Sequence, residues 1–213
     1  MGADDSSPKF GSVQWWQRVA RRIRVPLGFV TAALYLFELW RRAPRIEAVE
    51  WSVALVGPGL WLRGYASGYV KKNRELTVTG PYAYTRNPLY LGSMLMAAGF
   101  AVALGSWLVG AVLAAGFAAI YVPTIASEER FLRATFPGFE AYCRQVPRLI
   151  PRLVWLGSGG AGAAGRGEDG EGGFSFKLYL QHREYNALLG ASLLYLCLLY
   201  LRPLMRAILP QGW

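Results

Sequence analysis

Residues 87 to 127 restrict the fold of this chain more than any other feature, because these 41 positions contain no Lys, Arg, Asp, Glu or His. A helix rises about 1.5 Å per residue, and a bilayer core takes about 20 residues to cross. The stretch is therefore long enough for two crossings, with a turn near Gly105 and Ser106. Because a hairpin of this length returns to the face that it left, the residues on its two sides should meet at one membrane surface.

The composition of the 213-residue chain also favours an integral membrane protein. Hydrophobic residues make up 54% of it, above the roughly 45–50% of soluble domains on a count that includes Gly. The formal net charge is +10, and the basic residues flank the apolar segments. Anionic headgroups and the positive-inside rule explain this charge pattern. We therefore expect membrane lipids as partners and no nucleic acid.

The predicted fold is an all-α integral membrane protein with about five transmembrane helices, an N-terminal interfacial helix and short cytoplasmic helices. Residues 1–24 form the interfacial helix, and residues 25–70 hold the first two crossings. Residues 71–152 form a core that contains the hairpin. Residues 153–184 are a glycine-rich cytoplasmic connection, and residues 185–213 hold the last crossing.

The distribution of Lys and Arg predicts the orientation of the chain. Most of these side chains fall on the side of the N-terminus when five crossings are assumed, which places the N-terminus and the residues around the hairpin in the cytoplasm. A bacterial inner membrane fits this orientation. The oligomeric state stays open.

Three features of the first two crossings bear on function. Gly57-Pro58-Gly59 is expected to break the second crossing, because a proline frees a carbonyl and permits a kink. Glu38 lies one turn before Arg41 and Arg42, and an ion pair at the helix end explains it best. Arg63 either extends to the surface or faces a polar cavity, and the sequence leaves both readings open.

The polar residues on either side of the hairpin predict defined turns. Thr79 to Tyr82 should form a tight turn, since Gly permits positive φ and Pro restricts its own φ. Asn87-Pro88 should begin the next helix. Proline has no backbone N–H, and in the first turn of a helix that group would have no intrahelical partner. After the hairpin, Glu128 to Arg152 should form a pair of short surface helices separated at Pro137-Gly138.

Arg86 and Tyr90 on one side of the hairpin should face Glu128 and Glu129 on the other. From these residues alone, a polar site and a simple surface ion pair are both open. A single histidine, His182, and two cysteines make a metal site unexpected.

Two motifs, LTVTGPYAYTRNPLYLG and EERFLRATFPGFEAYCRQVPRLIP, occur in order on the two sides of the hairpin. They resemble the isoprenylcysteine carboxyl methyltransferase family and its bacterial members, which are related to phospholipid N-methyltransferases. The resemblance runs from about Leu62 to Pro151. It implies methyl transfer from S-adenosyl-L-methionine to a lipophilic small molecule.

The resemblance also implies a set of site residues. Beside it, we predict catalytic roles for Arg86, Glu128 and Glu129 from their charge and position, and we expect Arg63 and Arg130 to contact the substrate. Cofactor contacts fall on a longer set: Leu76, Thr77, Val78, Tyr82, Asn87, Pro88, Leu89, Tyr90 and Glu128.

This chain departs from the family at two positions. Asn87 stands where the family has a histidine. Asparagine keeps a hydrogen-bond donor and an acceptor, but it cannot carry a charge near neutral pH. Thr124 replaces an arginine that holds the substrate carboxylate in eukaryotic members, and threonine cannot make that bidentate contact. Methylation of an isoprenylcysteine-like carboxylate is the favoured activity. The alternatives are N-methylation of an amine lipid, an NADPH-dependent membrane reductase and a non-catalytic membrane protein of the same fold.

Overall fold

The computed structural model describes residues 26–42, 44–71, 75–151, 173–201 and 203–204 of the chain. All regular secondary structure in these residues is helical, as predicted. The predicted interfacial helix at residues 1–24 and most of the glycine-rich connection lie outside the described residues.

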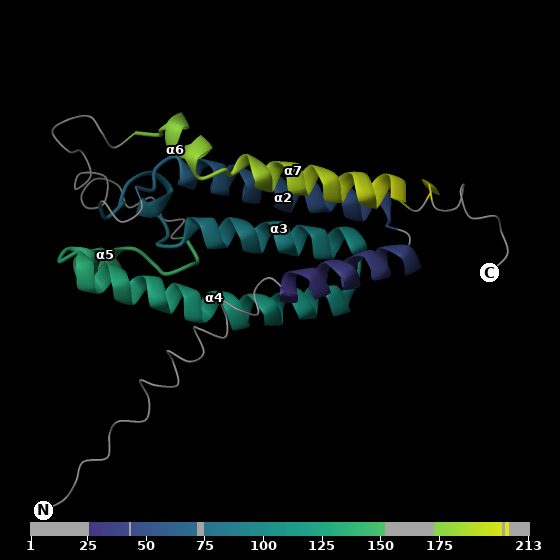
Figure 1. Ribbon diagram of the computed structural model, residues 1–213, viewed down its shortest axis with the longest axis horizontal. Helices are drawn as coiled ribbons and strands as arrows, with labels where there is room; N and C mark the ends of the chain where they lie inside the picture. The colour runs from purple at the N-terminus through teal and green to yellow at the C-terminus, as the bar shows by residue number, and fades with distance from the viewer. Residues whose placement is uncertain (1–25, 43, 72–74, 152–172, 202, 205–213) are drawn as a thin grey trace, which may run out of the picture.

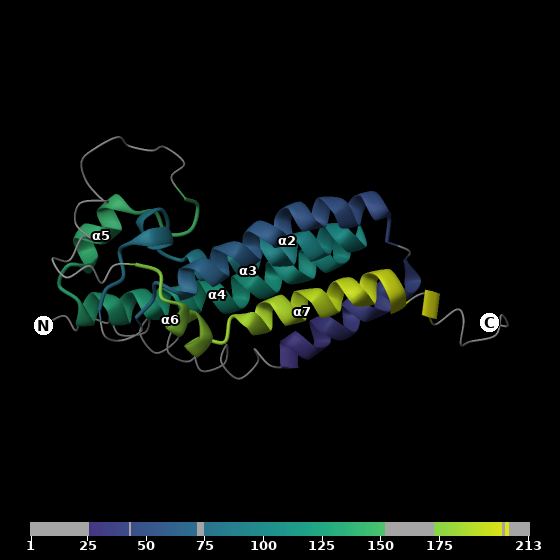
Figure 2. The ribbon, with the colours of Figure 1, turned by 90° about the horizontal axis from the view of Figure 1, so that it is seen from above.

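The long helices run side by side along the longest axis of the molecule (Figure 1 and Figure 2). Helices α5 and α6 lie at one end of this bundle, beside the loop between α2 and α3. In chain order the elements are a helix over residues 26–41, α2 (Ile46–Ser67), a 3₁₀ turn (Gly80–Ala83), α3 (Pro88–Leu104), α4 (Trp107–Thr135), α5 (Phe139–Gln145), α6 (Phe176–Gln181) and α7 (Tyr185–Leu196), which continues as a π-helical segment (Cys197–Leu201).

The hairpin predicted from the uncharged stretch is confirmed as helices α3 and α4. Gly105 ends α3 with a φ of 61°, a left-handed conformation that glycine adopts without a steric penalty. Ser106 caps α4, and its hydroxyl accepts a hydrogen bond from the Val109 amide at 3.4 Å. The helices therefore reverse direction at the two residues expected from the sequence.

Two predicted boundaries are wrong. Helix α4 runs without a break to Thr135, so Glu128 and Glu129 belong to the long helix and not to a separate surface helix. The charged residues after Ser127 are good helix formers, and the first breaking signal comes only at Pro137. Helix α2 also continues through Pro58 instead of breaking there. The expected break at Pro137-Gly138 is confirmed, because α5 begins at Phe139.

Helices α2 and α3 make the closest contact in the bundle, through glycines. A Cβ atom on Gly92 would lie 2.7 Å from the Gly59 carbonyl oxygen and 2.7 Å from Cγ of Arg63. A Cβ atom on Gly99 would lie 2.6 Å from Cγ2 of Val56. Small residues thus allow close helix packing here.

Replacing Gly92 with alanine should therefore destabilise the fold by about 1–3 kcal/mol, because the backbone carbonyl that its Cβ meets cannot move independently of α2. Gly57→Ala is the matched control, since a Cβ at position 57 meets no atom within 4 Å. Thermal unfolding in detergent would measure both. Equal midpoints for the two variants would contradict the packing described above.

Glu38 lies at the end of the bundle opposite to α5 and α6, and it is only 2% exposed. Its carboxylate lies 2.8 Å from Nε of Arg42 and 3.4 Å from NH1 of Arg41. The Ser106 hydroxyl donates to the same carboxylate at 3.2 Å. The predicted ion pair is confirmed, and it joins the first helix to the turn between α3 and α4.

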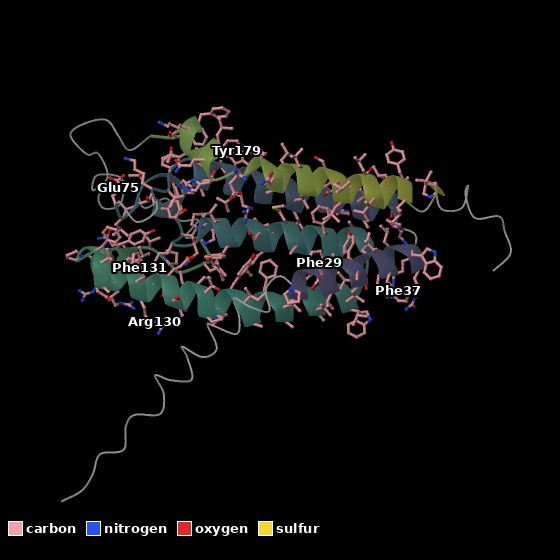
Figure 3. The ribbon with its side chains drawn as sticks, viewed as in Figure 1. Phe29, Phe37, Glu75, Arg130, Phe131 and Tyr179 are labelled. Carbon is pink, nitrogen blue, oxygen red and sulfur yellow. The ribbon has the colours of Figure 1, made fainter. Side chains whose placement is uncertain are left out.

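One helix of the described residues, α4, is long and apolar enough to cross a membrane, with a mean hydropathy of 2.0 over its best stretch. Only 11% of that stretch is buried inside the described structure. Helix α3 and residues Tyr185–Leu201 are also apolar but shorter. Figure 3 shows further apolar side chains on the first helix, where Phe29 and Phe37 are 73% and 50% exposed. Five crossings are thus not established, although α4 meets the requirements for one.

Candidate functional site

A tight turn before α3 begins the candidate site. Gly80 has a φ of 60°, and a Cβ atom there would lie 2.7 Å from the ring of Tyr69. Glycine is therefore required both by the left-handed conformation and by the neighbouring ring. The residues before it, Leu76 and Val78, pack against the buried side chains of α5. The predicted turn at Thr79 to Tyr82 is confirmed as the 3₁₀ segment.

Tyr82 is the buried centre of this turn, with 8% of its surface exposed. Tyr142 on α5 donates a hydrogen bond from its hydroxyl to the Tyr82 carbonyl oxygen at 2.7 Å. Burial raises the pKa of the Tyr82 phenol well above its usual value, and Tyr142 raises it further. The carboxylates of Glu128 and Glu184 raise the same pKa. Tyr82 is thus a neutral phenol within electrostatic reach of two carboxylates.

Three hydrogen bonds tie the segment before α3 to the segment after α5. The Thr85 hydroxyl donates to the Leu149 carbonyl oxygen at 2.9 Å. The Arg86 amide donates to the Pro147 carbonyl oxygen at 2.9 Å, and Nδ2 of Asn87 donates to the Arg148 carbonyl oxygen at 2.8 Å. The two sequence motifs are therefore joined directly, by two side-chain donors and one backbone donor to backbone carbonyl oxygens.

Glu129 is the centre of a charged cluster. NH1 of Arg86 lies 3.0 Å from its Oε1, and NH2 of Arg148 lies 2.9 Å from its Oε2. NH1 of Arg86 also donates to Sγ of Cys143 at 3.0 Å. Side chains of Arg86 and Glu129 are only 16% and 12% exposed. This pair is consequently not the solvated surface ion pair that the sequence left open.

Glu128, one residue earlier on α4, has a different environment. It is exposed, and its Oε1 accepts a hydrogen bond from the Tyr90 hydroxyl at 2.8 Å. The ring of Tyr90 lies against Tyr121, with 4.8 Å between the ring centroids. Tyr121 lies two helical turns before Glu128 and therefore on the same face of α4. An accessible carboxylate and two aromatic rings thus share one position.

The Nε atom of Arg86 is a further hydrogen-bond donor of the site. This atom is buried and has no hydrogen-bond partner among the described residues. A buried unsatisfied donor is unfavourable, and such atoms in native proteins usually have a bound partner. Arg86 is next to Asn87 and near Tyr90, so this donor lies within the candidate site.

An apolar cavity of about 550 Å³ lies between α3 and α4, and Tyr90 and Leu149 are part of its wall. The volume is in the usual range of small-molecule sites. Small side chains make this space: Ala97, Ala98, Ala101, Gly110, Ala114 and Ala118. Small residues thus allow close packing at the α2–α3 contact, whereas these residues leave room between α3 and α4.

The structure brings together four of the predicted residues, namely Arg86, Tyr90, Glu128 and Glu129. Arg63 instead pairs with Glu184, next to Leu89. Arg130 is exposed at the α5 end of α4, beside Phe131 (Figure 3), and its Nε donates to the Ala126 carbonyl oxygen at 3.1 Å. The roles of these residues in catalysis and binding stay predictions.

Sequence reasoning did not assign Arg148, Cys143 or Tyr121 to the site. Arg148 and Cys143 lie within the second motif, but only contacts in the folded chain show that they reach Arg86 and Glu129. Tyr121 could have been predicted, because its spacing from Glu128 places both residues on the same face of a helix.

These features define a helical bundle with a polar site at one end of an apolar cavity. The sequence pattern of the family described as phospholipid methyltransferase matches residues 51–138. The predicted resemblance is therefore confirmed for this segment, which includes the turn, α3, α4 and the acidic pair.

Two curated relatives match the chain. The cobalt-zinc-cadmium resistance protein CzcN of Cupriavidus metallidurans is 43% identical over 102 residues, which are 48% of this chain and 46% of that protein. The nickel-cobalt-cadmium resistance protein NccN of Alcaligenes xylosoxydans xylosoxydans is 39% identical over 102 residues, with the same shares. The match thus spans about half the length of each relative. No solved structure matches the chain. Within the part of the chain that the structure describes, no group of three or more His, Cys, Asp or Glu could hold a metal ion.

Proposed function

We propose that this protein is a membrane methyltransferase that moves a methyl group from S-adenosylmethionine to a lipophilic substrate. The observation that carries the proposal is the position of Tyr90. Its hydroxyl donates to the exposed Glu128 carboxylate, and its side chain lines the apolar cavity between α3 and α4. One residue thus connects a site for a charged molecule to a site for an apolar one. The family match over residues 51–138 supports methyl transfer as the reaction.

The surface of α4 supports a membrane location. A long apolar helix with 11% of its best stretch buried would expose a large apolar area to water in a soluble protein. A bilayer removes this penalty. The positive-inside pattern favours the cytoplasmic face of a bacterial inner membrane for the end of the bundle that holds Glu128.

The donors and acceptors of the site fit S-adenosylmethionine, which supplies an electrophilic methyl group on a sulfonium ion. Glu128 can neutralise the ammonium group of the methionine part. The rings of Tyr90 and Tyr121 can attract the sulfonium by cation–π interaction. The buried Nε of Arg86 can donate to an anionic oxygen. The turn at Tyr82 offers backbone groups for the adenine edge.

The favoured acceptor is the carboxylate of an isoprenylcysteine-like molecule. A carboxylate needs no general base, so the residues of the site would act by orientation and by exclusion of water. Thr124, which replaces the family arginine, donates its hydroxyl to the Ile120 carbonyl oxygen of its own helix. Arg130 is the exposed arginine that we assign to a substrate carboxylate.

An amine lipid is the alternative acceptor, and it requires a base. Both oxygens of Glu129 accept hydrogen bonds from arginines, whereas Glu128 is exposed and accepts one from Tyr90. If the acceptor is an amine, we therefore assign the base to Glu128, which then takes this role instead of neutralising the methionine ammonium. Methylation of lipid acids and of lipid amines, assayed side by side, distinguishes the two acceptors.

Titration of the detergent-solubilised protein with S-adenosylmethionine, with NADPH as comparison, tests the proposal. Wild-type protein should bind the first, and Glu128→Gln should bind it about tenfold more weakly because a charge-assisted contact is lost. Glu140→Gln, which alters an exposed carboxylate on α5, should bind like the wild type.

The other outcomes decide between the alternatives. Binding of NADPH alone would favour a membrane reductase. Binding of S-adenosylmethionine without methylation of any lipid would favour a non-catalytic protein of the same fold. If neither compound bound, the proposed activity would be rejected.

A further inference from the structure

Arg63 and Glu184 form an ion pair between parts of the chain that are distant in sequence. NH2 of Arg63 lies 2.8 Å from Oε2 and 3.0 Å from Oε1 of Glu184, and Nε of Arg63 lies 3.0 Å from Oε2. The two side chains are 24% and 12% exposed. Such a bidentate pair fixes the orientation of both groups. Glu184 directly precedes α7, so the pair joins the C-terminal part of the chain to α2.

The other side of the same guanidinium contacts the first turns of α3. NH1 of Arg63 donates to the Leu89 carbonyl oxygen at 3.4 Å and also contacts the Ser93 hydroxyl. The Ser93 hydroxyl in turn donates to the Leu89 carbonyl oxygen at 2.9 Å. Leu89 directly precedes Tyr90. Arg63 thus bridges Glu184 and the helical turn that presents Tyr90 to the site.

The side chain of Arg63 lies directly against Gly92 of α3. A Cβ atom on Gly92 would lie 2.7 Å from Cγ of Arg63, so glycine at this position lets the side chain pass against α3. The electrostatics point to the same cluster, because the Tyr82 phenol is within reach of the carboxylates of both Glu184 and Glu128. The ion pair is therefore part of the polar end of the bundle.

We propose that Glu184 is a positioning residue, which acts through Arg63 to hold the first turns of α3 and thereby Tyr90. The segment that contains α6 and α7 then completes the site, although it lies outside residues 51–138, where the family pattern matches. On this assignment Arg63 supports the site from behind, since its donors are directed to Glu184, Leu89 and Ser93. The inference rests on the proposed function.

The test compares Glu184→Gln with Glu184→Asp and with Glu38→Gln. Glu184→Gln removes the charge that orients Arg63, and Glu184→Asp keeps it. Glu38→Gln removes a buried carboxylate of a similar ion-pair network at the opposite end of α3. Amide hydrogen exchange of residues 89–96 and the dissociation constant of S-adenosylmethionine are measured for each full-length protein in detergent.

Glu184→Gln should accelerate exchange at residues 89–96 and raise the dissociation constant about tenfold, as expected when a guanidinium loses its acceptor. Glu184→Asp should restore most of the affinity. Glu38→Gln should lower the unfolding temperature and leave both the exchange at residues 89–96 and the dissociation constant unchanged.

If Glu184→Gln lowered only the unfolding temperature, as Glu38→Gln does, the pair would be structural and the inference would be overturned. If the wild-type protein did not bind S-adenosylmethionine, the proposed function would fail. Hydrogen exchange at residues 89–96 would then still decide whether Glu184 holds α3.

Discussion

Ala114→Phe is expected to reduce methylation of a lipid substrate at least tenfold while the affinity for S-adenosylmethionine stays unchanged. Ala114 lines the cavity of about 550 Å³ between α3 and α4. A benzyl group at this position would occupy space that an apolar chain of the substrate needs. Because the group enters an open space and not a packed core, it should not strain the fold. Initial rates with a lipid acceptor and cofactor titrations would measure the two effects separately.

Ala115→Phe is the matched control for this prediction. Ala115 is the next residue on the same helix, it is exposed, and it is not part of the cavity wall. The two variants add the same group to the same segment and differ in the direction of the side chain. Equal rates for the two variants would show that the cavity does not hold the substrate.

Glu129→Ala is expected to lower the free energy of unfolding by about 2–3 kcal/mol, because it leaves two arginines of the site without their carboxylate. Arg86 is 16% exposed and Arg148 is 46% exposed. The effect should therefore be smaller than for a fully buried pair, since water can solvate Arg148. Denaturant or thermal unfolding in detergent would measure the change.

Glu140→Ala provides the comparison, because it removes a carboxylate that pairs with Arg133 at the exposed surface. That change should alter stability much less than Glu129→Ala does, because water solvates both charges. Arg86→Ala should be more damaging than Arg148→Ala, because Arg86 is more buried and also donates to Cys143. A stability of Glu129→Ala equal to that of Glu140→Ala would show that the cluster does not hold the two motifs together.

Much of the architecture could be predicted because it depends on local features of the chain. The absence of charge between residues 87 and 127 predicts a helical hairpin, and the structure places its turn at Gly105 and Ser106. The start of α3 at Pro88 and the turn at Gly80 follow from the restricted backbone of proline and the freedom of glycine. The two motifs were sufficient for the family resemblance.

The two wrong boundaries have different physical causes. The sequence predicts a break at Pro58, but α2 continues there, packed against α3 through Gly59 and Gly92. The loss of apolar character after Ser127 predicts the end of the hairpin's second helix there, but α4 continues to Thr135. Charge indicates where a helix leaves an apolar environment, and it does not indicate where its hydrogen bonds end.

The all-α class, the hairpin and the meeting of Arg86 with the acidic pair follow from the amino-acid sequence alone, because helix length and spacing bring these residues to one end of the bundle. The packing of the helices determines that Glu129 binds two arginines whereas Glu128 accepts from Tyr90, and that Arg63 pairs with Glu184. Adjacent residues on a helix point about 100° apart, so their partners depend on which elements pack on each face. Such packing joins residues that are far apart in the chain, so it cannot be predicted from local sequence patterns.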